Sequence, residues 1–422
     1  MEKLSATSNL QLPASNLQHG MKTAQLLAQE KSAYIRVEPP CQYFGTCGGC
    51  SLQDLAYEHQ LALKRERIQR AFASLSGVPP LEIVGLEEPW RYRNKAEFTF
   101  GEANGQLALG YHAARSFWRV VDLEDCLLVP ESVSHVLRDV RALAAQTGLP
   151  AYHPRTHQGF FRYLLVRSSH ATGELLVCLM TSPGPREAVE RLAHALLPHH
   201  PSISSFYWGI TNRVADVALP DELLLLHGAR HLEDRLGPFR IRLHPLSFLQ
   251  PTHAQAERVY DVLCRALRNA PSGIAWDLYC GIGLVAFYLS RSFQKVYGID
   301  IEPRHLELAA LNASLNGLSN IEFRAGRVET LLTDRRFWLQ QAKPDVIVVD
   351  PPRAGLHPQA LSSVLSARPA YLAYLSCNVQ SLVRDLGLLL SGFPRYRLIE
   401  ARAFDMFPQT NHVEILTLLK RA

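Results

Sequence analysis

Three cysteines lie within ten residues of one another, in the segment CQYFGTCGGC at 41–50. Cys41, Cys47 and Cys50 account for three of the eight cysteines in 422 residues. Such a group is typical either of a disulfide framework in a secreted protein or of a metal or iron–sulfur site in a reducing compartment. The first 20 residues lack the apolar core of a signal peptide. We therefore expect a cytoplasmic protein, which favours the metal or iron–sulfur interpretation.

A glycine-rich turn stands at 277–284, in DLYCGIGL, where a predicted strand ends and a helix begins. Glycine lets the backbone approach a ligand closely. About twenty residues later, Asp300 ends the next predicted strand in VYGID, where an acid can bind ribose hydroxyls. The pattern suits a nucleotide-containing ligand. The alternative is a tight strand-to-helix turn followed by a solvated acid.

The segment VVDPPRAGL at 348–356 places an acid after a buried strand and two prolines after the acid. The prolines predict a rigid turn that presents Asp350 into a cleft. Asp-Pro-Pro also resembles the loop with which base methyltransferases hold an extruded nucleobase. The adenine amino-methyltransferases have an aromatic residue after the prolines, and here Arg353 stands there. The alternative is an ordinary turn with a capping aspartate.

Cys377 ends the next predicted strand, in YLSCNVQSLVRDL at 374–386, and would share the cleft with Asp350. A cysteine in a strand is usually a small buried hydrophobe. That interpretation is sufficient for three further cysteines, to which we assign no role: Cys178, Cys264 and Cys280.

Glu414 is an acid in the otherwise apolar strand HVEILTLL. It either faces solvent or acts as a base whose pKa is tuned by apolar walls. A cysteine, a base and a methyl donor are the groups that methylation of uracil C5 requires. A thiolate adds to C6, C5 then attacks an electrophilic methyl group, and the base removes the C5 proton so that the thiol can leave.

The elements that position these residues alternate between short apolar strands and helices after about residue 246. This alternation predicts an α/β fold, a doubly wound Rossmann-like parallel sheet that binds ligands at the carboxyl ends of its strands. The expected strands are IAWDLYC, KVYGIDI, IEFRAG, DVIVVD, YLAYLSC and HVEILTLL.

Four segments are expected along the chain. Residues 1–33 form a disordered tail, and 34–84 hold the cysteine segment and an amphipathic helix. Residues 85–245 form a mixed α/β domain with strands such as KAEFTFG and FRYLLVRSS, in which basic residues beside aromatic rings could bind nucleic acid such as RNA. Residues 246–422 form the catalytic domain.

Composition fits a soluble globular protein, with 47% hydrophobic and 20% charged residues. No apolar run approaches the roughly 20 residues of a membrane span. The net charge of +5 is too mild to indicate a nucleic-acid partner by itself. Basic clusters at 64–70, 90–95 and 113–119 could hold phosphates, or they could be ordinary surface.

Four motifs, in the order DLYCGIG, DPPRAGL, LSCN with RDL downstream, and FDMFPQTNHVE, closely resemble those of the S-adenosylmethionine-dependent RNA uracil-C5-methyltransferases. The resemblance runs from about residue 41 to the C-terminus. It implies that Cys377 is the nucleophile and Glu414 the general base. It also implies contacts to the cofactor or the target base from Gln250, Tyr279, Asp300, Asp350 and Phe248.

The segment C-x5-C-G-G-C resembles the iron–sulfur segment of the family members that modify ribosomal RNA. In those proteins the fourth ligand comes from a segment like VVDLEDCLLVP, which points to Cys126 here. The resemblance therefore implies a [4Fe–4S] cluster on Cys41, Cys47, Cys50 and Cys126. The spacing alone would also suit a structural zinc ion.

The chain departs from the family pattern in several places. Val379 and Ser381 stand where Pro and Thr are usual, and Leu284 stands where a polar residue often meets the cofactor. The segment RAGRVE at 324–329 lacks the usual acid near the adenine. The 40 residues before Cys41 are too few for the RNA-binding β-barrel that many members carry.

We therefore expect a monomeric enzyme that methylates C5 of a uridine in structured RNA. Ribosomal 23S RNA is favoured over tRNA because bacterial tRNA members typically lack the cluster cysteines. One rival is an RNA-binding or RNA-folding protein whose methylation is incidental or lost, and the complete set of site residues argues against loss of catalysis. A second rival is a cytosine-C5 methyltransferase, whose usual proline-cysteine motif is absent.

Overall fold

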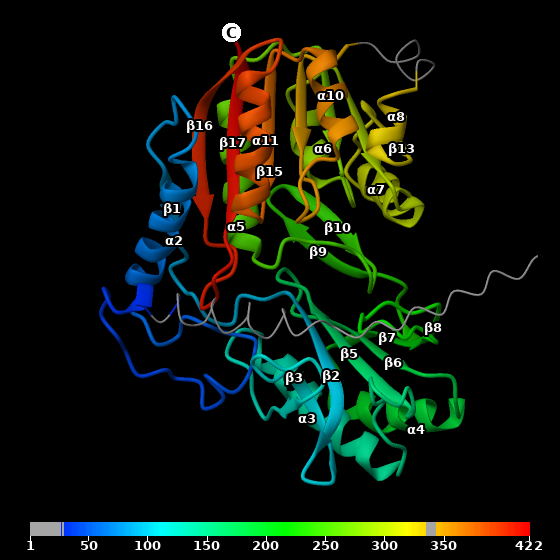
Figure 1. The fold of residues 1–422 in the computed structure, drawn as a ribbon. Helices are drawn as coiled ribbons and strands as arrows, with labels where there is room; N and C mark the ends of the chain where they lie inside the picture. Colours follow the sequence, from blue (N-terminus) through cyan, green and yellow to red (C-terminus); the bar gives the residue numbers. More distant parts are fainter. Residues whose placement is uncertain (1–26, 28, 335–342) are drawn as a thin grey trace, which may run out of the picture.

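The structure, a computed structural model, describes residues 27, 29–334 and 343–422. Most of the expected tail, 1–33, lies outside this range. The described chain forms two bodies, one above the other in Figure 1. Among the described helices, none is long and apolar enough to cross a membrane.

The lower body contains a seven-stranded sheet in the order β4-β3-β2-β5-β6-β7-β8. Neighbouring strands are antiparallel except for β6 and β7, which are parallel. The strands are β2 (Lys95–Ala103), β3 (Gln106–His112), β4 (Val120–Asp122), β5 (Phe161–Ser168), β6 (Leu175–Thr181), β7 (Ile203–Ile210) and β8 (Glu222–Gly228). One face of this sheet buries α3 (Glu131–Gln146) and α4 (Arg186–Leu196), and the short helix η1 (Leu197–His199) follows α4.

The upper body contains an eight-stranded sheet in the order β1-β16-β17-β15-β14-β11-β12-β13. Seven strands share one direction, and β17 runs opposite to both of its neighbours. The strands are β1 (Glu82–Val84), β11 (Ile274–Leu278), β12 (Lys295–Asp300), β13 (Ile321–Ala325), β14 (Val346–Val349), β15 (Tyr371–Ser376), β16 (Tyr396–Phe404) and β17 (Glu414–Arg421).

Helices cover both faces of the upper sheet. In β14, Val346 and Val348 belong to one hydrophobic cluster, and Ile347 and Val349 to the other. A strand buried on both faces reads as a continuous apolar run, which is why VIVV forms a central parallel strand. One face packs on α5 (His253–Ala266), α6 (Leu284–Ser290) and α7 (Pro303–Leu315), and the other on α2 (Tyr57–Phe72), α8 (Val328–Leu331), α10 (Pro358–Ala367) and α11 (Val379–Ser391).

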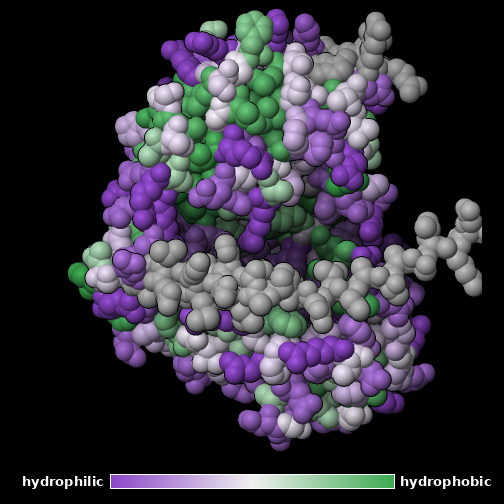
Figure 2. Space-filling view, viewed as in Figure 1, coloured by the Kyte–Doolittle hydropathy of each residue, from purple (hydrophilic) through white to green (hydrophobic). Residues whose placement is uncertain are grey.

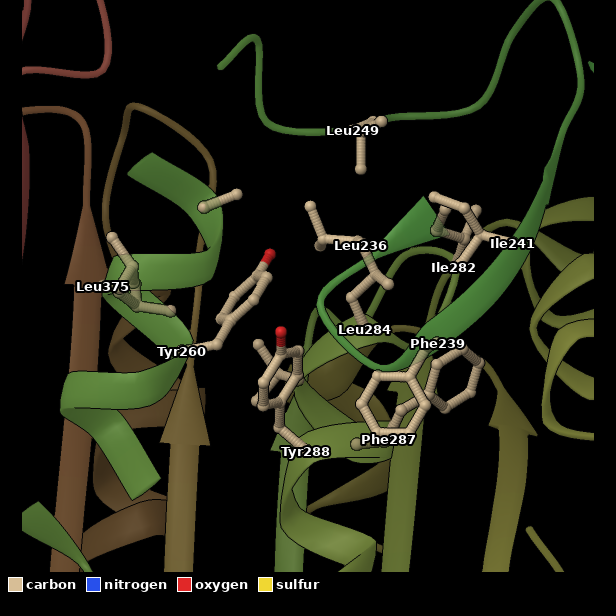
Figure 3. Packing of buried hydrophobic residues seen from close by; sticks show 14 of the residues in the cluster. Leu236, Phe239, Ile241, Leu249, Tyr260, Ile282, Leu284, Phe287, Tyr288 and Leu375 are labelled. Carbon is tan, nitrogen blue, oxygen red and sulfur yellow. The ribbon is translucent and has the colours of Figure 1, made fainter. Parts of the chain in front are cut away.

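A hairpin of β9 (Leu232–Leu236) and β10 (Phe239–Leu243) packs on the upper body. Figure 3 shows Leu236, Phe239 and Ile241 of this hairpin directed toward the side chains of α5 and α6. The Phe239 ring centroid lies 5.1 Å from that of Tyr288 and 5.8 Å from that of Phe287. The hydrophobic core of the upper body therefore includes residues before 246.

The N-terminal segment packs on the upper body as well. Ile68 and Phe72 of α2 join the hydrophobic cluster formed by α11, and β1 pairs with β16 at the sheet edge. Lys31 and Glu30, within the range expected to be a tail, form ion pairs with Asp54 and with arginines of α2. The end of that range is thus part of the folded structure.

Candidate active site

The candidate nucleophile and the candidate base come together because β17 is antiparallel to β15. Parallel strands β14 and β15 end at the same edge, where Asp350 and Cys377 follow them. Strand β17 begins at this edge with Glu414, and Ile415 pairs with Ser376 of β15. The sequence pattern predicts Glu414 in a parallel sheet. Reversal of β17, which returns from β16 through residues 405–413, brings the carboxylate to the cysteine.

Burial gives this edge unusual acid–base properties. Burial, with the charge of Asp350, raises the pKa of Glu414 well above its ordinary value, and burial raises the pKa of Asp350 to about 7. Glu414 is buried, and its Oε1 atom has no hydrogen-bond partner in the described part of the chain. At neutral pH the two carboxyls therefore retain a proton, and Glu414 can exchange one with a ligand.

The same environment acts on the thiol. Burial and then the charge of Glu414 raise the pKa of Cys377, whereas the guanidinium of Arg353 lowers it. Cys377 is half-buried and thus reachable from outside. A bound substrate would meet a protonated thiol next to buried carboxyls and one cation, which is a suitable arrangement for proton transfer before nucleophilic attack.

Helix α11 holds the DPPRAGL loop in place. Asp385 Oδ2 accepts bonds from the Leu356 N–H at 2.8 Å and the Tyr374 hydroxyl at 2.7 Å. Arg384 Nη2 donates to the Ala354 carbonyl at 2.8 Å. A side chain at Gly355 would meet Asp385 Oδ2 at 2.6 Å from its Cβ, and φ there is +81°, so glycine is required.

Asn378, which follows the candidate nucleophile, links the two loops of the site. Its side chain caps α11 by accepting from the N–H groups of Gln380 and Ser381, and its Nδ2 donates to the Arg353 carbonyl at 2.9 Å. Asparagine at this position thus starts the helix and fixes the loop that carries Arg353. Ser381, one of the departures from the family pattern, retains a hydroxyl bond to the Asn378 carbonyl at 3.2 Å.

Helix α2 holds the loop that leads into Glu414. Lys64 Nζ and the Tyr57 hydroxyl donate to the carboxylate of Asp405 at 2.5 and 3.0 Å. The Lys64 and Asp405 side chains are 1% and 0% exposed. Gln60 makes two bonds to Gln409, whose φ is +67°. The loop is therefore anchored by buried polar contacts along one helix.

The basic clusters differ in their accessibility. In 64–70, Lys64 is buried against Asp405, and both Arg67 and Arg70 pair with Glu30. In 90–95, Arg91 pairs with Asp125 at 2.8 Å, and Asn94 Nδ2 donates to the Gln250 carbonyl at 2.7 Å. These two clusters serve the fold. In 113–119, Ala113 is buried, but Phe117, Trp118 and Arg119 are exposed.

The cofactor end of the candidate site lies where β11 and β12 end. Asp300 Oδ2 accepts from the Gly281 N–H and Oδ1 from the Glu302 N–H, both at 2.9 Å. Burial raises the pKa of Asp300, but the His305 side chain and then these two backbone bonds lower it below its ordinary value, so the carboxylate is charged. Tyr279, with φ of +66°, opens the turn and packs at the edge of the core. This arrangement presents an anchored carboxylate beside a glycine turn, as ribose binding requires.

The loop 244–251, before α5, carries the two remaining predicted contacts. Gln250 is buried, and Phe248 is 57% exposed. A pocket of about 560 Å³ opens beside this loop, lined among others by Ser247 and His305. His305 also approaches Asp300, with 3.5 Å between its Nδ1 and Oδ1. In the view of Figure 2, the surface is hollowed between the two bodies.

The four predicted cluster cysteines line one small cavity: Cys41, Cys47, Cys50 and Cys126. Burial raises the pKa of Cys47 to about 11 and of Cys50 to about 12. The nearby Cys126 thiol also raises both pKa values. Within the described residues, no group of three or more His, Cys, Asp or Glu side chains is arranged to hold a metal ion. The structure thus brings the four thiols together without showing a metal site.

Several structural residues of the site escaped the sequence analysis. Asp277 is buried at the end of β11, where its Oδ2 accepts from the Ala286 N–H at 2.9 Å. Burial and the nearby acids Asp350 and Asp300 raise its pKa well above the ordinary value. Its position as the first residue of the motif DLYCGIG could have identified Asp277 from the sequence. Lys64 and Asp405 gave no signal, because their pairing depends on tertiary contacts across more than 300 residues.

The fold and this arrangement of residues define a mixed α/β methyltransferase. The sequence model for tRNA (uracil-5-)-methyltransferase matches residues 231–422. An uncharacterized RNA methyltransferase of Oceanobacillus iheyensis is 33% identical over 399 residues, with 94% of this chain and 85% of the relative covered. A second one, from Caldanaerobacter subterraneus, is 34% identical over 401 residues, with coverage of 93% and 87%.

A solved structure resembles most of the chain. It is the tRNA (uracil-54, C5)-methyltransferase of Pyrococcus abyssi in complex with S-adenosyl-L-homocysteine, with a TM-score of 0.71 and 25% identity. The alignment covers 88% of this chain and 86% of the other. The protein belongs to the RNA uracil-5-methyltransferase family and is an S-adenosylmethionine-dependent enzyme. The expected α/β methyltransferase fold and reaction class are confirmed.

Proposed function

We propose that the enzyme methylates C5 of a uridine in RNA through a covalent bond between Cys377 Sγ and uracil C6, with Glu414 as the base. The observation that carries this proposal is the meeting of Cys377, Glu414 and Asp350 at one sheet edge. These are the groups that a poorly nucleophilic uracil C5 requires. A protein that merely binds RNA would not need a buried glutamate and a half-buried aspartate beside an accessible thiol.

The residues act in sequence. Arg353 favours the thiolate of Cys377 once the thiol proton and the proton held by the carboxyl pair have been released to solvent. Sulfur adds to C6, and the electron pair of the C5–C6 bond moves to C5. S-adenosylmethionine supplies the electrophilic methyl group that C5 attacks. Glu414, in its ionised form, then takes the C5 proton, and the C6–S bond breaks to return the thiolate.

The residues that would hold S-adenosylmethionine lie along the same edge. Asp300 would accept the ribose hydroxyls, and Tyr279 would pack against the adenosine or methionine part. Gln250 would contact the cofactor from the loop before α5, and Asp350 would lie between the methionine and the uracil. Phe248, exposed on the same loop, would contact the flipped base. The anchored carboxylate of Asp300 supports this orientation.

Replacement of Cys377 tests the proposal. Cys377→Ala should abolish transfer of a radiolabelled methyl group to RNA, because C5 is then never activated. Cys264→Ala is the matched control, since this half-buried cysteine on α5 lies outside the site, and it should keep wild-type activity. Near wild-type turnover by Cys377→Ala would refute the covalent mechanism.

For the RNA target we favour 23S ribosomal RNA, supported by the likeness of the cysteine segment to that of ribosomal members. The second candidate is tRNA, which is favoured by the solved structure from Pyrococcus abyssi and by the family description. Mapping 5-methyluridine in both RNAs, in cells with and without the protein, separates the two. Loss of a tRNA site alone would overturn the ribosomal proposal. The monomeric state and the cytoplasmic location remain predictions from the sequence.

We also propose that Cys41, Cys47, Cys50 and Cys126 bind a [4Fe–4S] cluster. Four thiols around one cavity are a donor set that suits such a cluster, and it also suits zinc. Resemblance to the ribosomal members favours iron. Methyl transfer neither consumes nor releases electrons, so the cluster would have a structural role.

A further inference from the structure

A second pocket lies on the lower body. Its volume is about 290 Å³, and it is bordered by β2, β3, β4, the start of β5 and the loops 151–154 and 211–221. None of its lining residues belongs to the proposed methyl-transfer site. The volume is near the lower end for small-molecule pockets, which suits a single nucleobase better than a larger ligand.

A buried arginine lines this pocket. Arg162 is 2% exposed, and its guanidinium carbon lies 3.8 Å from the centroid of the Tyr152 ring. Its Nη1 donates to the Thr211 carbonyl at 3.3 Å, but Nε and Nη2 have no hydrogen-bond partner in the described chain. Unpaired buried donors are costly. A ligand with two adjacent acceptors would satisfy this side of the guanidinium fork.

The lining of the pocket includes two acidic residues, Asp216 and Glu102. Asp216 accepts a hydrogen bond from the Tyr163 hydroxyl at 2.5 Å and faces His112 Nε2 at 3.1 Å. The second acid of the lining, Glu102, is exposed to solvent. Hydrogen bonds with His112 and Tyr163 lower the pKa of Asp216, and so does the charge of Arg162. The Nε and Nη2 donors of Arg162 have no partner in the described chain, so a ligand that presents hydrogen-bond acceptors is favoured over a cation.

Two exposed aromatic residues stand beside the pocket. Phe117 and Trp118 are 54% and 45% exposed, and Trp118 lines the pocket. The guanidinium carbon of Arg155 lies 5.0 Å from the Trp118 ring centroid and 5.9 Å from that of Phe117. A single exposed aromatic needs no explanation. Two adjacent rings with a cation beside a pocket form the kind of surface on which unpaired bases stack.

We propose that this pocket binds one unpaired nucleotide of the RNA, separate from the uridine at Cys377. The base stacks on Trp118 and Phe117, and Arg162 meets two adjacent acceptors of the same nucleotide. These are either O6 and N7 of a guanine or two phosphate oxygens. The inference rests on the proposed function in one respect, that the ligand is RNA.

Binding of short RNAs tests the site directly. The probes are fluorescein-labelled pentamers without uridine, CCGCC, CCACC and a form with an abasic central nucleotide, measured by fluorescence anisotropy. Trp118→Ala and Phe117→Ala should each weaken binding of the first two about tenfold. Phe393→Ala is the matched control, because Phe393 is 77% exposed with Arg368 at 5.2 Å from its ring. It should bind like wild type.

Arg162→Met separates the two ligand sources. If the fork meets guanine, this variant loses the preference for CCGCC over CCACC. If the fork meets phosphate, binding of all three pentamers weakens alike. Circular dichroism and S-adenosylmethionine titration check that each variant is folded. Unchanged pentamer affinity in Trp118→Ala and Phe117→Ala overturns the inference.

Methyl transfer to full-length RNA, measured in parallel, keeps this inference distinct from the proposed function. Trp118→Ala should raise the KM for RNA about tenfold and retain kcat at saturating RNA. Wild-type KM in Trp118→Ala would contradict the second site and leave the methyltransferase mechanism intact. Pentamer binding by a wild-type enzyme that methylates no RNA would support the second site and contradict the proposed mechanism.

Discussion

Two carboxyl groups, Asp350 and Glu414, lie at the same sheet edge as the Cys377 thiol, and Glu414 Oε1 has no hydrogen-bond partner in the described part of the chain. In Glu414, burial and the charge of Asp350 both oppose ionisation. A protein that needed only stability would place apolar residues here, since a buried acid weakens the fold wherever it must ionise. The positions of Asp350 and Glu414 therefore point to proton transfer as the reason for their presence.

These raised pKa values predict how stability depends on pH. A carboxyl whose pKa is raised in the folded state binds more protons folded than unfolded, so its favourable contribution is complete below about pH 4 and is lost as pH rises through the folded pKa. For Asp350 that value is about 7. Glu414→Gln removes one of the two charges. Its Tm should match wild type at pH 4 and exceed it by a few degrees at pH 8.

Differential scanning calorimetry at both pH values measures this difference. Glu400→Gln is the control, because Glu400 is a half-buried acid of β16 on the same sheet. Its Tm difference from wild type should not change with pH. Two results would contradict this account. The Tm difference between Glu414→Gln and wild type would be equal at both pH values, or the variant would have the lower Tm at pH 8. Either would show that ionisation of Glu414 does not destabilise the folded protein.

At this scale the sequence predicted Cys377, Glu414, Asp350 and Asp300 from their positions in motifs. It could not predict that Arg384 and Asp385 hold the loop of Asp350, or that Glu414 is desolvated. Those facts depend on which side chains meet after folding. Motif positions identify the groups that carry charge and sulfur, and tertiary contacts determine their pKa.

Among the elements, α2 has the least expected role. It was predicted as an amphipathic helix with a possible phosphate-binding cluster, and it instead clamps residues 405–413. Because these residues lead into β17, the helix fixes the position of the start of β17, where Glu414 lies. The N-terminal segment therefore positions a catalytic-domain loop.

Loss of the buried ion pair between Lys64 and Asp405 should show that the loop before Glu414 depends on α2. Lys64→Met leaves Asp405 buried with the Tyr57 hydroxyl and without its cation, and breaking such a pair costs about 3–5 kcal/mol. Chemical denaturation should show a loss of that size, with reduced methyl transfer because the Glu414 loop loses an anchor. The control is Arg65→Met on the same helix, whose side chain is exposed. A Lys64→Met variant with wild-type stability would contradict the clamp.

Most strands and α2 were predictable because their apolar patterns are strong, and β11, β12, β13, β14 and β15 all form where expected. The direction of β17 was not predictable, since an apolar strand pairs equally well either way until its connection is known. Strands β1 and β16 form the sheet edge and have mixed burial, which leaves a weak pattern. The reversal of β17 is nevertheless what completes the site.

At the scale of the whole molecule, the cysteine segment joins the upper and lower bodies. Ser51 and Leu52 donate to the Gln409 carbonyl of the upper body, at 2.9 and 3.0 Å. Gly48 donates to the His112 carbonyl of β3, at 2.9 Å. The segment thus touches the loop of Glu414 on one side and the strand before Trp118 on the other. A cluster held by this segment would stiffen both.

The cluster proposal has a direct test. Protein purified without oxygen should be brown and contain about four irons per chain. Cys126→Ser should remove the colour and lower the Tm, because Cys126 comes from a segment 76 residues after Cys50 and would close a long loop. Cys178→Ser is the control and should stay brown. Stoichiometric zinc without iron would contradict the iron–sulfur assignment.

The covalent mechanism is the central claim, and trapping its intermediate tests it most directly. In the Glu414→Gln enzyme, Cys377 should still attack uracil and C5 should still be methylated, but the C5 proton should not be removed. A covalent protein–RNA adduct should therefore accumulate when S-adenosylmethionine is present. On a denaturing gel with labelled RNA, we predict a slow-moving band that is absent in the Glu414→Gln, Cys377→Ala double variant. Full activity of Glu414→Gln without an adduct, or an adduct that survives loss of Cys377, would contradict the mechanism.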